Sequence, residues 1–323
     1  MNSGSHIQPD ADAILQAAKR INRHINRTPV LSSHTINRLF GAEIFMKCEN
    51  FQKVGAFKAR GATNAVLSLE KSLLQRGIAT HSSGNHAQAL SWAASLVNTK
   101  AYIVMPCDSS KIKVAAVKDY GGLITFCEPT LTSRETTLTR VIQQTGATEI
   151  HPYNNEHIIA GQATAALELL EEVHDLDILL TPVGGGGLLS GTCLAAHYFH
   201  PATRVIAAEP EQANDAFLSF SNKRFIPSIN PNTIADGLRT SLGSLTFPII
   251  LKYVHSVVTV REESIVKAMR FLWERMKIIV EPSSAVPFAA IMEGKIEIAG
   301  KKTGIIISGG NVDLDALPWM NNE

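Results

Sequence analysis

Short apolar runs alternate along the chain with longer segments in which apolar residues recur every three or four positions. The short runs are rich in β-branched residues and predict strands over residues 78–80, 101–105, 123–126, 178–183, 205–208, 257–260 and 304–307. The longer segments predict helices over residues 59–69, 85–96, 133–145, 159–173 and 262–276. Strands that are apolar at nearly every position are covered on both faces, so the pattern predicts an α/β protein with parallel sheet and flanking helices.

Three of the predicted strands are followed by polar or glycine-rich turns: Gly184, Gly185, Gly186 and Gly187 after 178–183, Ser-Ser-Gly-Asn-His at 82–86 after 78–80, and Ser-Gly-Gly-Asn at 308–311 after 304–307. Ligands bind at the carboxyl ends of such strands, so we expect the three turns to line one cleft. Four glycines cost roughly 2 to 4 kcal/mol relative to alanine, which close approach of backbone N–H groups to an anion would offset. The alternative is a flexible turn. The run fits neither the Walker pattern nor GxGxxG with its later acidic residue.

Lys58 lies between two glycines, Gly55 and Gly61, beside the start of the predicted helix 59–69. An ammonium group near a helix N-terminus meets unfavourable positive potential and, when buried, loses hydration; both effects lower its pKa. Such a lysine is a candidate nucleophile toward an aldehyde, and an aldehyde that also carries a phosphate would use the glycine run. The alternative is an ordinary solvated surface lysine.

The composition limits the partners. The 323 residues are 45% hydrophobic and 18% charged, enough for one large core or two moderate ones. Thirty basic and 29 acidic side chains give a net charge of +1, so no overall field draws the chain to nucleic acid or a membrane. The four cysteines lack metal-binding spacing and are expected to be reduced, mostly buried thiols. Without an apolar run of about 18 residues or a signal-peptide core, a cytoplasmic location is expected.

Four segments carry a resemblance to a known family. They are AFKARGA at 56–62, SSGNHAQA at 82–89, PVGGGGL at 182–188 and SGGN at 308–311. In this order, and with IAGQ at 159–162 and IADG at 234–237, they resemble the serine racemase and serine/threonine dehydratase family of fold-type II pyridoxal-phosphate enzymes. The resemblance covers about residues 17–313 and implies two open, twisted, mostly parallel sheets flanked by helices.

Roles follow from the resemblance by matching position. Lys58 would bind pyridoxal phosphate through a Schiff base, with Phe57 beside the ring. Asn85 would hydrogen-bond the phenolic oxygen, the glycine run would bind the phosphate, and Ser308 would face the pyridine nitrogen. A serine hydroxyl does not force full protonation of that nitrogen as an aspartate would. The cofactor is therefore expected to be a weaker electron sink, which favours substrates with a β-leaving group.

The chemistry that the resemblance implies is removal of the α-proton by Lys58, loss of the β-hydroxyl, and release of a keto acid and ammonia. Serine would give pyruvate and threonine 2-oxobutyrate. Ser83 matches the residue that faces the other side of the α-carbon in serine racemases, which adds racemisation. The alternative for Ser83 is a hydrogen bond to the substrate carboxylate from a helix N-terminus, along with Ser82, Asn85 and His86. His86 is either a carboxylate ligand or a packed, hydrogen-bonded histidine.

The resemblance indicates the residues that contact the substrate side chain less fully than those that bind the cofactor. Arg134 and Ser241 match racemase positions near the substrate side chain, and Tyr153 stands where animal racemases tend to carry asparagine. Glu281 matches a glutamate near the cofactor ring, and its alternative is a helix entry with Pro282 in the first turn. Hydroxyaspartate ammonia-lyases have similar Ser-Ser-Gly-Asn-His stretches, so threo-3-hydroxyaspartate is an alternative substrate.

A carboxylate-rich segment follows the predicted strand 205–208. From its spacing alone it reads as a solvated acidic loop, because two carboxylates rarely suffice for a metal site. The resemblance implies instead that Glu209, the carbonyl of Ala213, and Asp215 bind a divalent cation, Mg, Mn or Ca.

Taken as a whole, the chain is expected to have a large cofactor-binding domain, residues 1–76 and 153–323, and a small mobile domain, residues 77–152, that closes over the substrate. The expected activity is that of a pyridoxal-phosphate-dependent serine racemase and serine/threonine ammonia-lyase. The resemblance also implies a homodimer, and no motif supports a nucleotide effector. The alternative outside enzymes is an amino-acid-binding protein derived from the fold, against which Lys58 and Ser83 argue.

Overall fold

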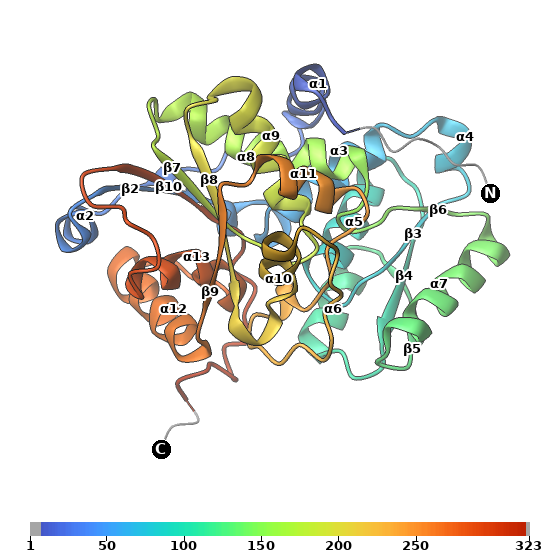
Figure 1. Cartoon of the computed structure of the whole chain (residues 1–323). Helices are drawn as coiled ribbons and strands as arrows, with labels where there is room; N and C mark the ends of the chain where they lie inside the picture. The colour runs from blue at the N-terminus through green and yellow to red at the C-terminus, as the bar shows by residue number, and fades with distance from the viewer. Residues whose placement is uncertain (1–7, 321–323) are drawn as a thin grey trace.

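Two sheets organise the chain in the computed structural model, which describes residues 8–320 (Figure 1). The larger sheet has the order β1 (Val30–Leu31), β2 (Glu43–Cys48), β10 (Lys302–Ile307), β7 (Ile178–Pro182), β8 (Arg204–Pro210) and β9 (Ser256–Val260). The smaller sheet has the order β5 (Leu123–Cys127), β4 (Ala101–Pro106), β3 (Ile78–His81) and β6 (Thr148–Glu149). The β1–β2 pair is antiparallel and the other strand pairs are parallel. The prediction of two mostly parallel sheets is confirmed.

Helices cover both faces of each sheet. The helices that pack around the larger sheet are α1 (Ala11–Ile21), α2 (His34–Phe40), α8 (Glu156–Glu172), α9 (Gly187–Phe199), α10 (Asp215–Asn222), α11 (Thr246–Tyr253), α12 (Glu262–Met276) and α13 (Pro282–Met292). Those nearer the smaller sheet are α3 (Lys58–Leu67), α4 (Lys71–Leu74), α5 (Asn85–Leu96), α6 (Lys111–Asp119) and α7 (Leu131–Thr145). Figure 1 shows α3 and α8 between the two sheets and α7 on the outer side of the smaller sheet.

Alternation along single strands divides the core into layers. In β7, Ile178 and Leu180 pack into the cluster formed with α12 and α13, whereas Leu179 packs into the cluster formed with α8 and α9. In β3, Ile78 faces the α3–α5 cluster and Ala79 faces α7. Successive side chains of a strand point to opposite faces, so an apolar residue at every position fills both layers.

The sequence missed β1, β2 and β6. The seven predicted strands all overlap the remaining observed strands within a few residues, and the predicted helices 85–96 and 262–276 coincide with α5 and α12. Strand β2 lies between β1 and β10 yet escapes detection because Lys47 occupies one of its buried positions. The strands β1 and β6 are two residues long, which is too short for a periodicity.

A buried ionic cluster joins α3 to its surroundings. The Arg60 guanidinium forms paired hydrogen bonds with Glu49 at 2.7 and 2.8 Å and with Glu168 at 2.7 and 2.9 Å, and one more with Thr164. Lys47 bonds Glu168 at 2.7 Å, so two cations balance two carboxylates. Glu49 lies in the short helix η1 (Glu49–Phe51) and Glu168 in α8. The first turn of α3 is therefore held from two sides.

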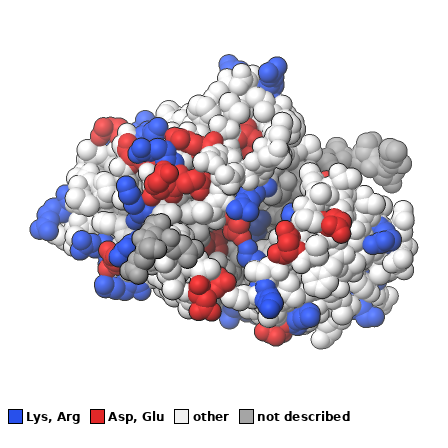
Figure 2. Space-filling model, turned by 90° about the horizontal axis from the view of Figure 1, so that it is seen from below, with Lys and Arg blue, Asp and Glu red and all other residues white. Residues whose placement is uncertain are grey.

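The molecular surface carries both signs of charge. Figure 2 shows acidic and basic side chains interspersed over the face seen from below, as expected for a net charge of +1. Within residues 8–320, no helix combines the length and the apolar character that crossing a bilayer requires.

Candidate active site

Lys58 is the first residue of α3, as the sequence predicted for a lysine beside the start of a helix. Its Nζ atom donates a hydrogen bond to the carbonyl oxygen of Pro152 at 2.9 Å and lies 5.2 Å from the centre of the Phe57 ring. Burial lowers the pKa of Lys58 to about 8, and the nearby charge of Glu281 acts in the opposite direction. An amine with this pKa has a far larger unprotonated fraction near neutral pH than an ordinary lysine, so it can act as a nucleophile or a base.

The segment before Lys58 is joined to the end of β10. Ala56 and Gly309 form an antiparallel bridge, and the Phe57 N–H donates to the carbonyl of Ser308 at 2.9 Å. A side chain at Gly309 would meet Glu281 and Ala56 at about 3 Å, which explains why the position is glycine. Two motifs some 250 residues apart in sequence therefore share backbone contacts.

Ser308 is fully buried, and its hydroxyl has a partner that the sequence did not indicate. Its Oγ lies 2.9 Å from Ser284 Oγ in the first turn of α13. Ser284 is held in turn by both backbone groups of Gly309 at 2.6 Å. The serine expected to face the pyridine nitrogen is thus part of a pair of hydroxyls.

Asn85 begins α5 and is linked to the larger sheet by its side chain. Its Nδ2 donates to both carboxylate oxygens of Glu281, at 3.0 and 3.1 Å. Its Oδ1 accepts a hydrogen bond from Asn311 Nδ2 at 2.8 Å, and the Asn311 N–H donates to Glu281. These contacts fix which end of the Asn85 amide is the donor. Burial, with a contribution from Asp236, raises the pKa of Glu281 to about 7.

The glycine run forms a tight turn between β7 and α9. A methyl group at Gly185 would lie 2.3 Å from the Tyr153 ring, and one at Gly184 would lie 2.9 Å from the backbone of Leu238. Gly186 adopts a left-handed conformation, φ +88°, directly before α9. The N–H groups at the start of an α-helix lack intrahelical partners, so this turn can receive a phosphate. Tyr153 follows Pro152 in the chain, which connects this turn to the Lys58 amine.

Three histidines surround this centre. His86 Nε2 lies 3.1 Å from the carbonyl of Ile150, and burial together with the charge of Lys58 lowers the pKa of His86 well below its usual value. His151 accepts backbone N–H groups at Nδ1, and burial lowers its pKa to about 4. His81 lies edge-on to His151, with ring centres 6.3 Å apart. All three are therefore neutral at pH 7 in the absence of a bound anion. Because a neutral imidazole has one N–H, the carbonyl contact of His86 leaves Nδ1 as an acceptor.

The expected substrate residues are not all tied to the Lys58 centre. Ser82 and Ser83 lie in the turn between β3 and α5, where Ser82 Oγ accepts the N–H of Gly84. Arg134, on α7, interacts electrostatically with His81. Ser241 accepts the N–H of Ser228 at 2.9 Å. Among residues 8–320 no hydrogen bond joins Arg134 or Ser241 to Lys58 or its partners.

The expected metal ligands lie together at the end of β8. Glu209 and Asp215 are only 1% and 4% exposed, and Glu209 accepts the N–H groups of Ala216 and Phe217. Burial raises the pKa of Asp215 to about 7 and that of Glu209 well above its usual range, with a further contribution from Asp215 to Glu209. Asp215 Oδ2 is buried without a hydrogen-bond partner in the part of the chain that the structure describes. In the same part, no three His, Cys, Asp or Glu side chains gather as a metal-binding group.

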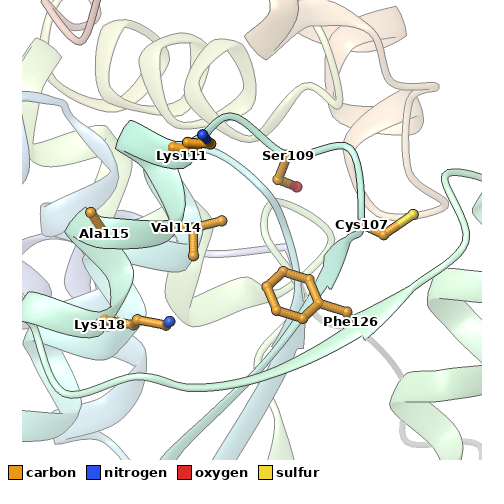
Figure 3. A pocket seen from close by; sticks show the side chains of 7 residues that line it. All are labelled: Cys107, Ser109, Lys111, Val114, Ala115, Lys118 and Phe126. Carbon is orange, nitrogen blue, oxygen red and sulfur yellow. The ribbon is translucent and has the colours of Figure 1, made fainter.

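A separate cavity of about 360 Å³ lies in the region of the smaller sheet, between α6 and β5. Figure 3 shows Val114 and Ala115 on the helix and Phe126 opposite them, with Cys107 and Ser109 on the connecting loop. None of the expected site residues lines it. Its walls are mainly apolar.

The fold is that of a fold-type II pyridoxal-phosphate enzyme. Residues 21–309 match the family described as pyridoxal-phosphate dependent enzyme, and the chain belongs to that family. Pyridoxal phosphate is accordingly its cofactor.

Within the family, the chain is similar to proteins of three descriptions. It is 49% identical over 311 residues to the beta-hydroxyaspartate dehydratase of Paracoccus denitrificans, covering 96% of this chain and 99% of that protein. It is 51% identical over 314 residues to the serine racemase of Dictyostelium discoideum, covering 96% of this chain and 97% of that protein. The crystal structure of serine racemase from that organism aligns with a TM-score of 0.90 at 50% identity, over 94% of this chain and 99% of that one. The crystal structure of the T.th. threonine deaminase aligns with a TM-score of 0.90 at 39% identity, over 95% and 100%.

Sequence reasoning missed Ser284, Asn311 as a partner of Asn85, and the carbonyl of Pro152. Asn311 stands within the SGGN motif, so its neighbourhood was indicated though its contact was not. Ser284 follows the expected Glu281 by three residues, one helical turn, which is the signal that could have placed it beside the site.

Proposed function

We propose that this chain catalyses β-elimination of hydroxy amino acids, converting L-serine to pyruvate and L-threonine to 2-oxobutyrate with release of ammonia, and that it also racemises serine. The observation that carries the proposal is the Lys58 amine, which lies at the start of α3 with its pKa lowered to about 8. The similarity to a serine racemase and a threonine deaminase supports this choice of substrates.

The residues around Lys58 fit the cofactor. The Lys58 amine would bind the aldehyde carbon of the cofactor, and the turn at residues 184–187 would bind its phosphate. The Phe57 ring would lie against the cofactor ring. Asn85 would donate to the phenolic oxygen, and Ser308 would face the ring nitrogen. Bound there, pyridoxal phosphate supplies a ring that accepts negative charge from the substrate α-carbon.

The protein groups then have separate tasks. Lys58 Nζ, with its lowered pKa, takes the α-proton on one side of the substrate. Ser83 is proposed to exchange a proton on the other side, which is what racemisation requires. The N–H groups at the start of α5 receive the α-carboxylate, and neutral His86 beside them adds no competing charge. Hydrogen bonds with Glu281 and Asn311 fix the orientation of the Asn85 side-chain amide.

We further propose that residues 77–152 form a mobile small domain and that residues 1–76 and 153–323 form the large one. Several contacts cross between them, among them Asn85 with Glu281, and Lys113 on α6 with Asp236 in the short helix η4 (Asp236–Leu238). These two are polar contacts beside the site, of the kind that forms and breaks as a domain closes. Closure would exclude water while the α-carbon carries charge.

A second candidate substrate is threo-3-hydroxyaspartate. Arg134 Nε is a buried donor without a hydrogen-bond partner in residues 8–320, and Arg134 interacts with His81 on the same side of the site. An unpaired guanidinium donor favours a substrate with a second carboxylate. The similarity to a beta-hydroxyaspartate dehydratase supports this candidate.

A divalent cation completes the proposal. Glu209, Asp215 and the carbonyl of Ala213 offer hard oxygen ligands, and the raised pKa values of both carboxylates mean that they lack a counter-charge. Asp215 Oδ2, buried and without a partner among the described residues, supplies the free ligand atom. The resemblance also implies a homodimer, which light scattering of the purified protein would test.

The deciding experiment supplies L-serine, D-serine, L-threonine and both threo-3-hydroxyaspartates to the purified enzyme and measures keto acid and chirality. Keto acid from serine or threonine, with D-serine formed from L-serine, is the expected result. Keto acid from hydroxyaspartate alone would favour the second candidate. The Lys58→Ala variant should lose the visible absorbance of lysine-bound cofactor; if the band persists, Lys58 is not the cofactor lysine, and turnover of none of these substrates would refute the proposal.

A further inference from the structure

Ser284 and Ser308 form a buried pair of hydroxyls whose hydrogens can be counted. Their Oγ atoms lie 2.9 Å apart, and the two residues are 0% and 1% exposed. Ser284 Oγ also lies 2.6 Å from both the amide nitrogen and the carbonyl oxygen of Gly309. The carbonyl of Gly309 has a second donor, the N–H of Glu281, at 3.0 Å.

Each hydroxyl has one hydrogen to donate and two lone pairs. Ser284 accepts the Gly309 N–H, so its remaining lone pair and its hydrogen are left for Gly309 and Ser308. In one arrangement Ser284 donates to the Gly309 carbonyl and Ser308 donates to Ser284, which leaves Ser308 with lone pairs toward the site. In the other, Ser284 donates to Ser308, whose own hydrogen then points into the site.

The first arrangement makes more hydrogen bonds within the protein. It uses both 2.6 Å contacts of Ser284 and the 2.9 Å contact with Ser308, whereas the second leaves the contact from Ser284 to the Gly309 carbonyl unmade. Buried hydroxyl groups strongly favour arrangements in which their hydrogens have acceptors. Without Ser284, Ser308 would lose this acceptor for its hydrogen and would donate into the site instead.

We infer that Ser284 is a positioning residue that turns the Ser308 hydroxyl into a hydrogen-bond acceptor for the ring nitrogen of pyridoxal phosphate. The inference rests on the proposed placement of the cofactor with its ring nitrogen at Ser308. An acceptor at this position favours the protonated nitrogen, because only the protonated nitrogen has a hydrogen to donate. Ser284 thereby strengthens the electron demand of the ring beyond what a lone serine provides.

The reaction outcome should follow from the charge on that nitrogen. Elimination is assisted by departure of the β-hydroxyl, so it depends less on the ring. Racemisation has no leaving group and needs the ring to hold the charge of the α-carbon until a proton returns. Ser284 therefore supports racemisation more than elimination, which revises the expectation that a serine at position 308 leaves a weak electron sink.

The test compares Ser284→Ala with Ser283→Ala, after each protein is loaded with cofactor labelled with ¹⁵N in the ring. Ser283 is a matched control because it belongs to the same turn of α13 and is buried, but its hydroxyl accepts the N–H of Gly237. The nitrogen resonance reports protonation without any turnover. We expect Ser284→Ala to lower the ratio of protonated to unprotonated nitrogen by about three- to tenfold, the change that one hydrogen bond makes. The ratio of racemisation to elimination of L-serine should fall by a similar factor, and Ser283→Ala should change neither.

Three outcomes overturn the inference. The first is a nitrogen resonance in Ser284→Ala that equals that of the wild type. The second is an equal shift in Ser283→Ala, which would mean that the effect comes from the helix and not from the hydroxyl pair. The third is an unchanged resonance in Ser308→Ala, which would also refute the proposed cofactor placement. A shift in Ser308→Ala without one in Ser284→Ala leaves the proposed function standing and removes only the role of Ser284.

Discussion

Asn85 and Glu281, 196 residues apart in sequence, lie against each other across the site, with the amide nitrogen of Asn85 at 3.0 and 3.1 Å from the two carboxylate oxygens. The amide can donate to the carboxylate but cannot neutralise it. Burial therefore still dominates and raises the pKa of Glu281 to about 7. The pair creates a dependence on pH at the junction of the two sheets.

The stability of the cofactor-free protein should reveal this dependence. The folded state binds the Glu281 proton more tightly than the unfolded state, whose pKa is near 4.5, so the free energy of unfolding should fall as pH rises from about 4.5 to 7. The contribution of Glu281 is on the order of 3 kcal/mol. Glu209 and Asp215 add a slope of the same sign, so the measurement is urea unfolding of wild type against Glu281→Gln across this range. A variant with the full wild-type slope would contradict the assignment.

Ser83→Ala should separate the two activities. Loss of a positioned acid or base reduces a proton transfer by about 10²- to 10⁴-fold, so serine racemisation should fall by that factor. Elimination from L-serine uses Lys58 and should stay within about tenfold of wild type. The chirality of residual serine and the formation of pyruvate are measured in one reaction, with Ser82→Ala as the neighbouring control. Equal loss of both activities would refute a second base at Ser83.

Cation binding at Glu209 and Asp215 should strengthen as pH rises, because a cation must displace protons from carboxylates whose pKa values are raised. Millimolar Mg²⁺, Mn²⁺ or Ca²⁺ should raise the melting temperature more at pH 8 than at pH 6, and a chelator should reverse the effect. Asp215→Asn should remove the response and leave the cation-free protein at least as stable. A chelator-insensitive wild type would count against the site.

Gly185→Ala should damage the turn that is proposed to bind the phosphate. The added methyl group would overlap the Tyr153 ring at 2.3 Å, so we expect a loss of about 1 to 3 kcal/mol in the free energy of unfolding, together with weaker retention of the cofactor. The double variant Gly185→Ala/Tyr153→Ala should recover part of this loss, since the ring is the obstacle. Unfolding curves and the dissociation constant of the cofactor measure both effects. No recovery in the double variant would locate the strain elsewhere.

Arg60→Met should be strongly destabilising. It would leave Glu49 and Glu168 buried with only Lys47 as a counter-charge, and breaking a buried ionic cluster costs about 3 to 5 kcal/mol. The exposed pair Arg27–Glu171 provides the control, because Arg27→Met should cost less than about 1 kcal/mol. Chemical unfolding of the two variants gives the comparison. Similar losses in both would mean that the cluster contributes no more than a surface pair.

The sequence predicted the parts of this structure that local chemistry determines. The apolar strands and the long helices are visible because burial leaves a periodic signal, as in the predicted helices 85–96 and 262–276, which coincide with α5 and α12. Lys58 was singled out by its place beside a helix start, and Asn85 and Ser308 lie in turns that follow predicted strands, whereas their individual roles came from the resemblance and stay predictions. The predicted helix 159–173 began three residues too late, since the first two residues of α8, Glu156 and His157, are polar.

What the sequence could not predict depends on packing between distant segments. The contact of Ser284 with Ser308 exists because α13 lies against the end of β10, and no local signal says which hydroxyls will meet. Lys47 and Arg60 are charged residues at fully buried positions, and only the arrangement of their partners from η1 and α8 makes this burial possible. The role of a residue that depends on such contacts can be recognised only in the three-dimensional structure.

The backbone bridge between Ala56 and Gly309 has a bearing on how this protein can change over evolutionary time. It binds the lysine segment and the Ser308 segment into one unit at the end of β10, whereas Ser83 and Arg134 belong to segments around the smaller sheet. If Ser83 and Arg134 contact the substrate as proposed, substitutions there would alter which amino acid is accepted without loosening the joined segments. Substrate preference could therefore diverge among relatives while the segments proposed to bind the cofactor stay the same.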